Sequence, residues 1–191
     1  MGIFSDLGVM VDGLEDDEAE EFDGGVEEIF RFDVSLTPEQ DIEIGVVIQE
    51  LDVEGFPEFG EEYSMLAHTF AQLITEHVGT YTESLMMAVA DLQELDVELS
   101  DEERAVLANE MKNENGAELL YSFPVLIMED EFDGSKNLGA GFNRSPKADV
   151  MLKLYGEEFI EAENAYQDLV TDAVLDHGLL FLKAVESIQK L

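Results

Sequence analysis

Three histidines, His68, His77 and His177, are the side chains of this sequence best suited to acid–base chemistry or metal binding. His68 and His77 are separated by nine positions, so at 100° per residue they project from opposite faces of one straight helix and cannot share a metal ion. His77 and His177 lie on apolar stripes, which is typical of histidines packed in a core. The sequence therefore predicts no catalytic residue, no cofactor and no histidine metal site.

An acidic fragment is the second candidate for metal binding. Glu129, Glu131 and Asp133 have the spacing of the first three ligands of an EF-hand loop, and Gly134 takes the place of its sharp turn. The first ligand is Glu instead of Asp, however, and Ala140 stands where the loop needs a bidentate Glu. The fragment predicts at most a weak surface cation site formed by Glu129, Glu131 and Asp133, and not a calcium sensor.

No other pattern indicates an enzyme. Gly139 and Gly141 are not followed by a third glycine or by the Lys-Ser/Thr pair of a phosphate-binding loop. The sequence has no Gly-x-Ser-x-Gly nucleophile turn, and it has no cysteine to serve as a nucleophile, a metal ligand or half of a disulfide. We therefore expect a protein without enzymatic activity.

The charge of the chain is its most unusual property. Of 191 residues, 46 are acidic and nine are basic, which gives a net charge of −37, yet 46% are hydrophobic. A disordered acidic chain would be poor in apolar residues. The repulsion is largely screened only near 1 M salt, where the Debye length falls to ~3 Å. The composition resembles that of proteins from salt-in halophiles, the haloarchaea and their viruses, and predicts a requirement for high salt.

The same composition limits location and partners. The longest uncharged run, residues 63–75, is too short and too polar to span a membrane, and residues 1–14 lack the basic start and apolar run of a signal peptide. We expect the cytoplasm of a halophile or a virion. Few basic residues and molar salt both disfavour nucleic-acid binding.

Hydrophobic periodicity predicts an acidic N-terminal arm over residues 1–24 and one α+β domain over residues 25–191. Its expected elements follow the order ββαααββα, with a small antiparallel or mixed sheet packed against helices and a long C-terminal helix. The first half of the domain is expected to hold a hairpin over 26–53 with a bulge near Gln49, helices over 63–77 and 81–95 separated at Gly79, and a third helix from the Ser100 and Glu103 capping box to Gly116. The second half is expected to hold a strand over 119–128 with Pro124 at an edge or bulge, a loop over 129–148, and a strand through Val150, Leu152 and Leu154. The last expected element is a helix from Glu157 that bends at Gly178.

Regions without acid are the most informative in so acidic a chain. Residues 63–90 hold only Glu76 and Glu83 as charged side chains, and the stretch 134–148 is net basic. Charged residues are typically depleted at the cores of protein interfaces. The interface residues predicted on this basis are Ser64, His68 and Gln72 of the first helix, Lys136, Leu138, Phe142, Arg144 and Lys147 of the loop, and Leu180 and Phe181 of the last helix.

These patterns favour a non-enzymatic structural or assembly protein that binds protein partners, above all copies of itself, or joins a larger complex such as the head, connector or tail of a virion. The competing hypothesis is a regulatory or small-ligand-binding protein of the haloarchaeal cytoplasm, with a pocket between sheet and helices. The mass of the protein in molar KCl separates the two hypotheses, because only the first requires a discrete assembly.

The charge generates a first prediction. Lowering KCl from ~1 M to dilute buffer should unfold or dissociate the protein, because the repulsion among its acidic groups is then no longer screened. Circular dichroism during the dilution measures the loss of helix. A cooperative thermal transition that is the same in dilute buffer and in molar KCl would refute the halophilic interpretation.

Overall fold

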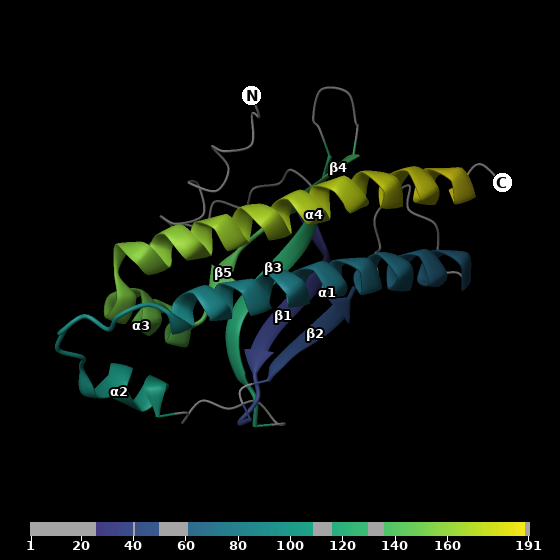
Figure 1. Ribbon diagram of the computed structural model, residues 1–191. Helices are drawn as coiled ribbons and strands as arrows, with labels where there is room; N and C mark the ends of the chain where they lie inside the picture. The colour runs from purple at the N-terminus through teal and green to yellow at the C-terminus, as the bar shows by residue number, and fades with distance from the viewer. Residues whose placement is uncertain (1–25, 40, 50–60, 109–115, 130–135, 190–191) are drawn as a thin grey trace, which may run out of the picture.

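The computed structural model describes residues 26–39, 41–49, 61–108, 116–129 and 136–189 (Figure 1). The predicted α+β class, with a small sheet and a long C-terminal helix, is confirmed. The predicted arm, residues 1–24, lies outside the described residues. The elements are β1 (Val26–Leu36), β2 (Ile42–Ile48), α1 (Glu61–Ala90), α2 (Asp101–Leu107), β3 (Glu118–Glu129), β4 (Lys136–Ala140), β5 (Asn143–Arg144), α3 (Pro146–Tyr155) and α4 (Glu157–Gln189).

The described strands form one antiparallel sheet in the order β2-β1-β3-β4, and β5 also pairs with β3. The predicted hairpin of β1 and β2 is confirmed, with Phe32 opposite Val46. Its pairing extends to the backbone hydrogen bond from Gln49 to Ile29, at 3.0 Å. The bulge expected just after Gln49 falls on residues that are not described.

Pro124 does not lie at an edge of the sheet, because β3 has neighbours on both sides. Its carbonyl oxygen accepts a hydrogen bond from the backbone N–H of Gly141 at 2.8 Å, so the backbone of Pro124 points toward β4 and β5. Pairing on that side stops at Ala140 and resumes at Asn143. The missing N–H of proline therefore faces an interruption of the ladder, where it breaks no hydrogen bond.

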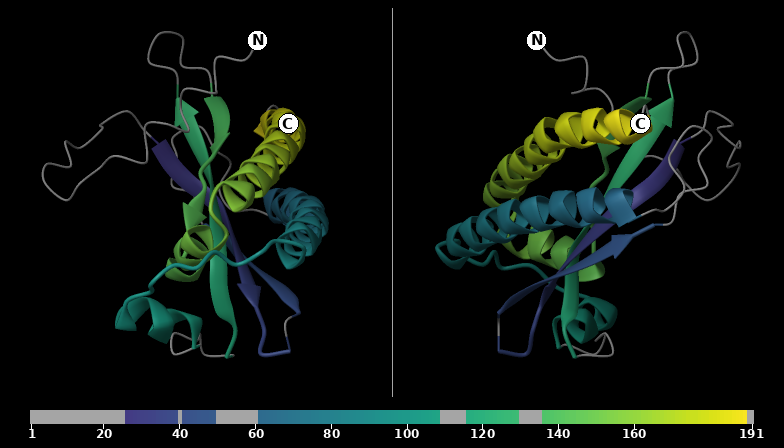
Figure 2. Two further views of the ribbon diagram at one scale, coloured as in Figure 1. Left: turned by 60° about the vertical axis from the view of Figure 1, so that its left-hand side comes forward. Right: turned by 90° about the vertical axis from the view of Figure 1, so that its right-hand side faces the viewer.

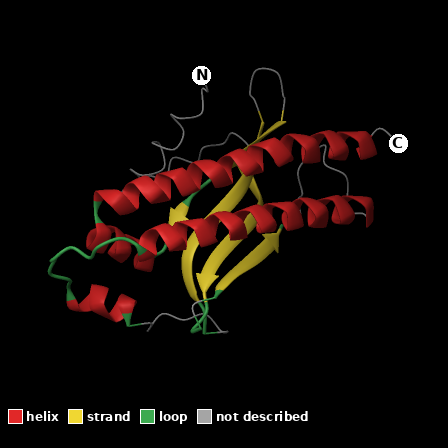
Figure 3. Ribbon diagram, in the orientation of Figure 1, coloured by secondary structure: helices red, strands yellow, loops and turns green. Residues whose placement is uncertain are grey.

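Helices α1 and α4 lie side by side over one face of the sheet (Figures 2 and 3). They are antiparallel, because Phe70 contacts Phe181 whereas Thr82, later in α1, contacts Tyr166, earlier in α4. Neither helix ends at the glycine where a break or bend was predicted.

The two glycines instead allow close packing on the strands. A Cβ atom on Gly79 would lie 3.4 Å from Cδ1 of Ile44 in β2, and one on Gly178 would lie 2.6 Å from Cδ1 of Leu138 in β4. At Gly178 a Cβ atom would be too close to Leu138, so a larger side chain would require α4 or Leu138 to move, whereas at Gly79 a Cβ atom would only just meet Ile44. The prediction of two separate helices over 63–95 was therefore wrong, because glycine was taken as a terminator where it is a contact.

The segment after β3 differs most from the prediction. Residues 129–148 are not a loop, because they include β4, β5 and the start of α3. The predicted strand through Val150, Leu152 and Leu154 is also wrong, because these residues belong to α3. The Ser145 side chain accepts a hydrogen bond from the N–H of Ala148 at 3.3 Å, and Pro146 begins the helix. A serine N-cap followed by proline is a signal for the start of a helix. The alternation of Val150, Leu152 and Leu154 indicated a strand instead.

Helix α2 begins as predicted. Ser100 and Glu103 form both hydrogen bonds of a capping box. The helix ends at Leu107, however, and not at Gly116. Gly116, with a φ of 78°, instead precedes β3.

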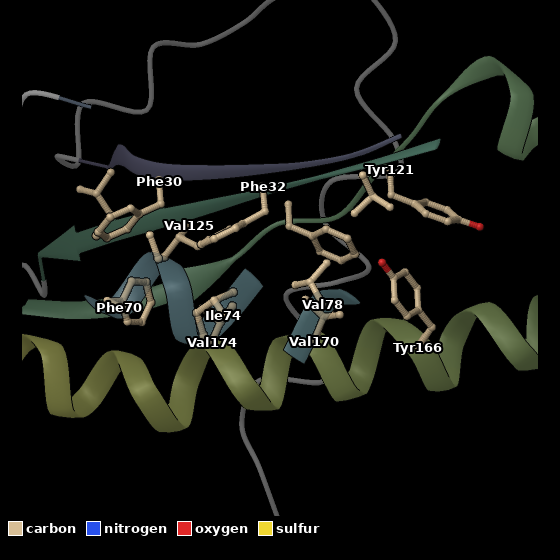
Figure 4. Close-up of a cluster of buried hydrophobic side chains, with 14 of the residues drawn as sticks. Phe30, Phe32, Phe70, Ile74, Val78, Tyr121, Val125, Tyr166, Val170 and Val174 are labelled. Atoms are coloured by element: carbon tan, nitrogen blue, oxygen red, sulfur yellow. The ribbon is translucent and has the colours of Figure 1, made fainter. Parts of the chain in front are cut away.

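One hydrophobic core joins the sheet to α1 and α4 (Figure 4). Phe30 and Phe32 point from β1 toward the helices, and Phe30 and Phe181 meet edge to face with ring centroids 5.5 Å apart. The other labelled members of the cluster are Tyr121 and Val125 from β3, Phe70, Ile74 and Val78 from α1, and Tyr166, Val170 and Val174 from α4. Among the described helices, none combines the length and apolar composition needed to cross a membrane.

The cap of α3 provides a second prediction. Changing Ser145 to Ala should lower the free energy of unfolding by about 1 kcal/mol, because a buried helix end loses its hydrogen-bond acceptor. Denaturant titration in constant molar KCl measures the change. Ser100→Ala is the matched control: α2 buries no residue, so its loss should fray that helix and affect global unfolding less. Equal effects of the two changes would contradict the role given to Ser145.

Candidate functional site

The basic residues of the acid-poor segment are used inside this chain. The Nε and Nη2 atoms of Arg144 lie 2.7 and 2.5 Å from Oε2 of Glu163. Glu163 projects from α4 and its side chain has no exposed surface. Arg144 therefore provides the countercharge for a buried carboxylate and joins β5 to α4.

Lys147 has a similar position at the start of α3. Its ammonium group forms an ion pair with Glu118 of β3, and both side chains are largely buried. Lys136 is placed by its backbone, which pairs with Glu129, whereas its side chain is not described. Contact of these three residues with another protein remains a prediction, but Arg144 and Lys147 already balance acidic groups within the fold.

The apolar residues predicted beside them also contribute to the core. Leu138 is buried against Gly178. Phe142 is half-buried and stacks on Tyr121, with ring centroids 5.2 Å apart. Of the predicted cation ligands, Glu129 lies in β3, while Glu131 and Asp133 are outside the described residues. No group of three or more His, Asp or Glu side chains within the described part of the chain is placed to hold a metal ion.

Buried tyrosines surround the Arg144–Glu163 pair. Desolvation raises the pKa of Tyr121 and of Tyr166 far above that of an exposed tyrosine, and the charge of Glu163 raises that of Tyr121 further. The hydroxyl groups of Tyr166 and Thr82 lie 2.8 Å apart and form a hydrogen bond. Both tyrosines therefore stay neutral near pH 7.

Two histidines from different helices come together, which the sequence analysis did not predict. The Nε2 atoms of His77 in α1 and His177 in α4 lie 3.1 Å apart, and the Tyr81 hydroxyl lies 3.4 Å from Nδ1 of His77. Since a hydrogen bond between two imidazole nitrogens needs one donor and one acceptor, the pair shares one proton. The two histidines were predicted to be packed in the core, but both are half-buried and they contact each other.

His177 also lines an apolar groove of about 150 Å³ between α1 and α4. The groove is open to solvent, since Leu73 and Leu180 of its lining are 40% and 63% exposed. Its lining is almost entirely apolar. The lining residues are Leu66, Thr69, Phe70 and Leu73 from α1, and His177, Leu180, Phe181 and Ala184 from α4.

The apolar run near the end of α4 divides between core and surface. Phe181 is 4% exposed, whereas Leu179 and Leu180 are 55% and 63% exposed. Within the protein, Phe181 is thus covered by the core and Leu182 is partly covered, whereas Leu179 and Leu180 are not. Leu180 lines the groove and Leu179 does not, so the two leucines differ in their relation to the groove although both are exposed.

Ser64, His68 and Gln72 lie on a different side of α1. They follow one another at intervals of four residues, and Thr75 and Gly79 continue the same row. Since Gly79 contacts Ile44, this row faces the β2 side of the helix. His68 and Gln72 are exposed, and Nδ1 of His68 lies 2.7 Å from the Ser64 carbonyl oxygen. The predicted interface residues thus belong to two separate surfaces.

Comparison with protein-family models found no match, and searches of curated proteins and of solved structures found none either.

The buried ion pair gives a third prediction. Arg144→Met should cost about 3 kcal/mol of folding free energy, because it leaves the Glu163 carboxylate buried without its countercharge. Adding Glu163→Gln should recover part of the loss. The matched control is Arg31→Met, whose ion pairs are near the surface and should contribute less than about 1 kcal/mol. Denaturant titrations that rank Arg31→Met as the more damaging change would overturn this assignment.

Proposed function

We propose that this protein is a non-enzymatic assembly subunit that binds further copies of itself through the groove between α1 and α4. The observation that carries the proposal is an exposed apolar groove on a chain with a net charge of −37. Leu180 is 63% exposed and Leu73 is 40% exposed at its border. An apolar patch on an otherwise charged surface is a typical site of protein association.

The charge of the chain favours a second copy as the partner. Two copies repel each other wherever acidic surfaces meet, so they associate best through a surface that lacks acid. Between Glu62 and Glu76, α1 has no charged residue, and this stretch supplies its half of the groove. Apolar contact is also strengthened rather than screened by salts that are excluded from protein surfaces.

The composition of the groove supports association rather than catalysis. Thr69 and His177 are its only lining residues with polar side chains, whereas a reaction requires charged or polar groups that converge on a substrate. The volume also disfavours the small-ligand alternative, because about 150 Å³ is below the ~300–1,000 Å³ of typical ligand pockets. A groove of this size fits one or two side chains of a neighbouring helix.

We further propose a salt-rich setting, either the cytoplasm of a halophile or a virion of one of its viruses. The charge supports this setting, because so acidic a surface needs molar salt for close contact between copies. Both locations are compatible with an assembly subunit.

The variant Leu180→Asp provides a fourth prediction, which tests the groove as an interface. It should reduce the mass of the assembly in molar KCl, because it places a charge in the groove contact, while its circular dichroism remains that of the parent. Leu179→Asp is the matched control: it introduces the same charge at an equally exposed leucine outside the groove, and should leave the mass unchanged. Phe181→Asp should instead unfold the protein, because it buries a charge in the core.

Light scattering coupled to size-exclusion chromatography measures these masses. Leu180→Asp and the parent assembling to the same mass would refute the groove as an interface, and a monomeric parent would refute the proposed function.

A further inference from the structure

The outer edge of β2 is a second surface to which none of the described strands is paired. In the sheet order β2-β1-β3-β4, strand β2 is terminal, and no strand among the described residues pairs with its outer side (Figure 1). Edge strands of natural proteins are commonly protected by Lys, Pro or a bulge. The sequence of β2, IEIGVVI, contains no Lys or Pro, and its pairing with β1 is regular over all seven residues.

The hydrogen bonds of the hairpin show which backbone groups point outward. Thr37 donates to Asp41, and Gln49 donates to Ile29. Because hydrogen-bonded pairs alternate along an antiparallel ladder, Glu43, Gly45 and Val47 bond to β1. The N–H and C=O groups of the intervening residues therefore point away from the sheet, and these residues are Ile42, Ile44, Val46 and Ile48.

We infer that β2 pairs with β2 of a second copy, antiparallel and across a two-fold axis at Gly45. This register places Ile42 opposite Ile48 and Ile44 opposite Val46, so that every outward backbone group of the strand finds a partner. Gly45 faces Gly45 of the other copy as a non-hydrogen-bonded pair, in which the Cα atoms approach to ~4.5 Å.

The charges of β2 agree with pairing of two identical strands. Glu43, the one charged residue in the strand, faces Val47 and not another Glu43. The two Glu43 residues are then separated by four positions, or about 13 Å along the strands. At each end, Asp41 faces Gln49, whose amide can donate a hydrogen bond to the carboxylate. A like-charge contact, which would oppose pairing in this acidic protein, is thus avoided.

The neighbouring flank of α1 is poor in acid. Ser64, His68, Gln72 and Thr75 form the row on the β2 side of the helix and carry no acid, although Glu61 begins this row and Gln72 donates a hydrogen bond to Glu76 at 3.3 Å. The apolar side chains of β2 remain only partly covered by α1, with Val46 36% exposed. Hydrogen bonds between strands and the burial of these side chains do not depend on unscreened charge, so both persist in molar salt.

The inference rests on the proposed function in one respect, since its partner is another copy of the same subunit. It adds a second contact on the opposite side of α1 from the groove. Two independent contacts on each subunit predict an assembly larger than a dimer.

Single cysteines test the register directly, because the natural chain has none. In Gly45→Cys the two thiols are opposite each other within the ~4.4–6.8 Å Cα separation of a disulfide, so oxidation in molar KCl should yield a covalent dimer. A Cβ atom fits at Gly45, where its nearest neighbour would be 3.9 Å away. Glu43→Cys is the matched control and should give no covalent dimer, because its thiols are too far apart.

A proline variant tests whether the crosslink needs strand pairing. Val46→Pro removes an outward N–H without removing a hydrogen bond to β1, and edge strands accept proline in this position. Added to Gly45→Cys, it should abolish the covalent dimer, whereas Val46→Ala, which keeps the N–H, should preserve it. Circular dichroism establishes that each variant is folded.

The outcomes separate this inference from the proposed function. If the parent assembles but Gly45→Cys gives no dimer, or no more than Glu43→Cys, the β2 contact is wrong and the groove stands. Crosslinking that persists with Val46→Pro also refutes the β2 contact. If Gly45→Cys crosslinks as expected while Leu180→Asp leaves the mass of the assembly unchanged, the β2 contact stands and the groove is wrong. A monomeric parent without a crosslink refutes both.

Discussion

The ion pair between Arg144 and Glu163 is the interaction on which the arrangement of α4 over the sheet depends. It fixes a buried acid of the helix to the short strand β5, beside the tyrosines of the core. The chain has nine basic residues, and Arg144 and Lys147 are both used to join elements across the interior. Because Glu163 is fully buried and Arg144 is 28% exposed, salt screens this pair less than it screens the surface. The Arg144–Glu163 and Lys147–Glu118 pairs would therefore persist in salt better than the exposed pair of Lys153 with Glu103.

The surface follows the opposite rule. If copies of this chain associate as we propose, repulsion among exposed acids would have to be screened by the solvent, and the contacts would depend on groups that the same salt does not weaken. The apolar groove and the outward backbone of β2 would both meet this condition. They lie on opposite sides of α1, whose acid-poor stretch carries an apolar and a polar exposed row. Helix α1 would then serve the core with one face and assembly with the other two.

Local pattern was sufficient to predict the parts of the fold that are local. Alternation in Phe30–Leu36 gave the hairpin, the apolar run gave β3, and helical spacing gave α4. The errors came where two local signals competed, as at Ser145, where a cap and a proline outweigh alternating apolar residues. The candidate site was mostly beyond prediction, because periodicity does not say which helices become neighbours. His77 and His177 meet across 100 positions, and Arg144 and Glu163 meet because β5 and α4 pack together. Leu180 and Phe181 could be selected in advance, from an apolar run too wide for one buried stripe, and both line the groove.

The proline in β3 has a consequence for the limits of growth. Opposite Pro124 the outer ladder is interrupted between β4 and β5, so that margin of the sheet consists of two short pieces. Strand β2 is the only long, regular margin among the described strands. A sheet with two such margins could add subunits without end and seed a fibril, as cross-β structures do. A sheet with only one long, regular margin can pair with one further sheet, and no such margin is then left for another. Pro124 would therefore protect against amyloid-like polymerisation.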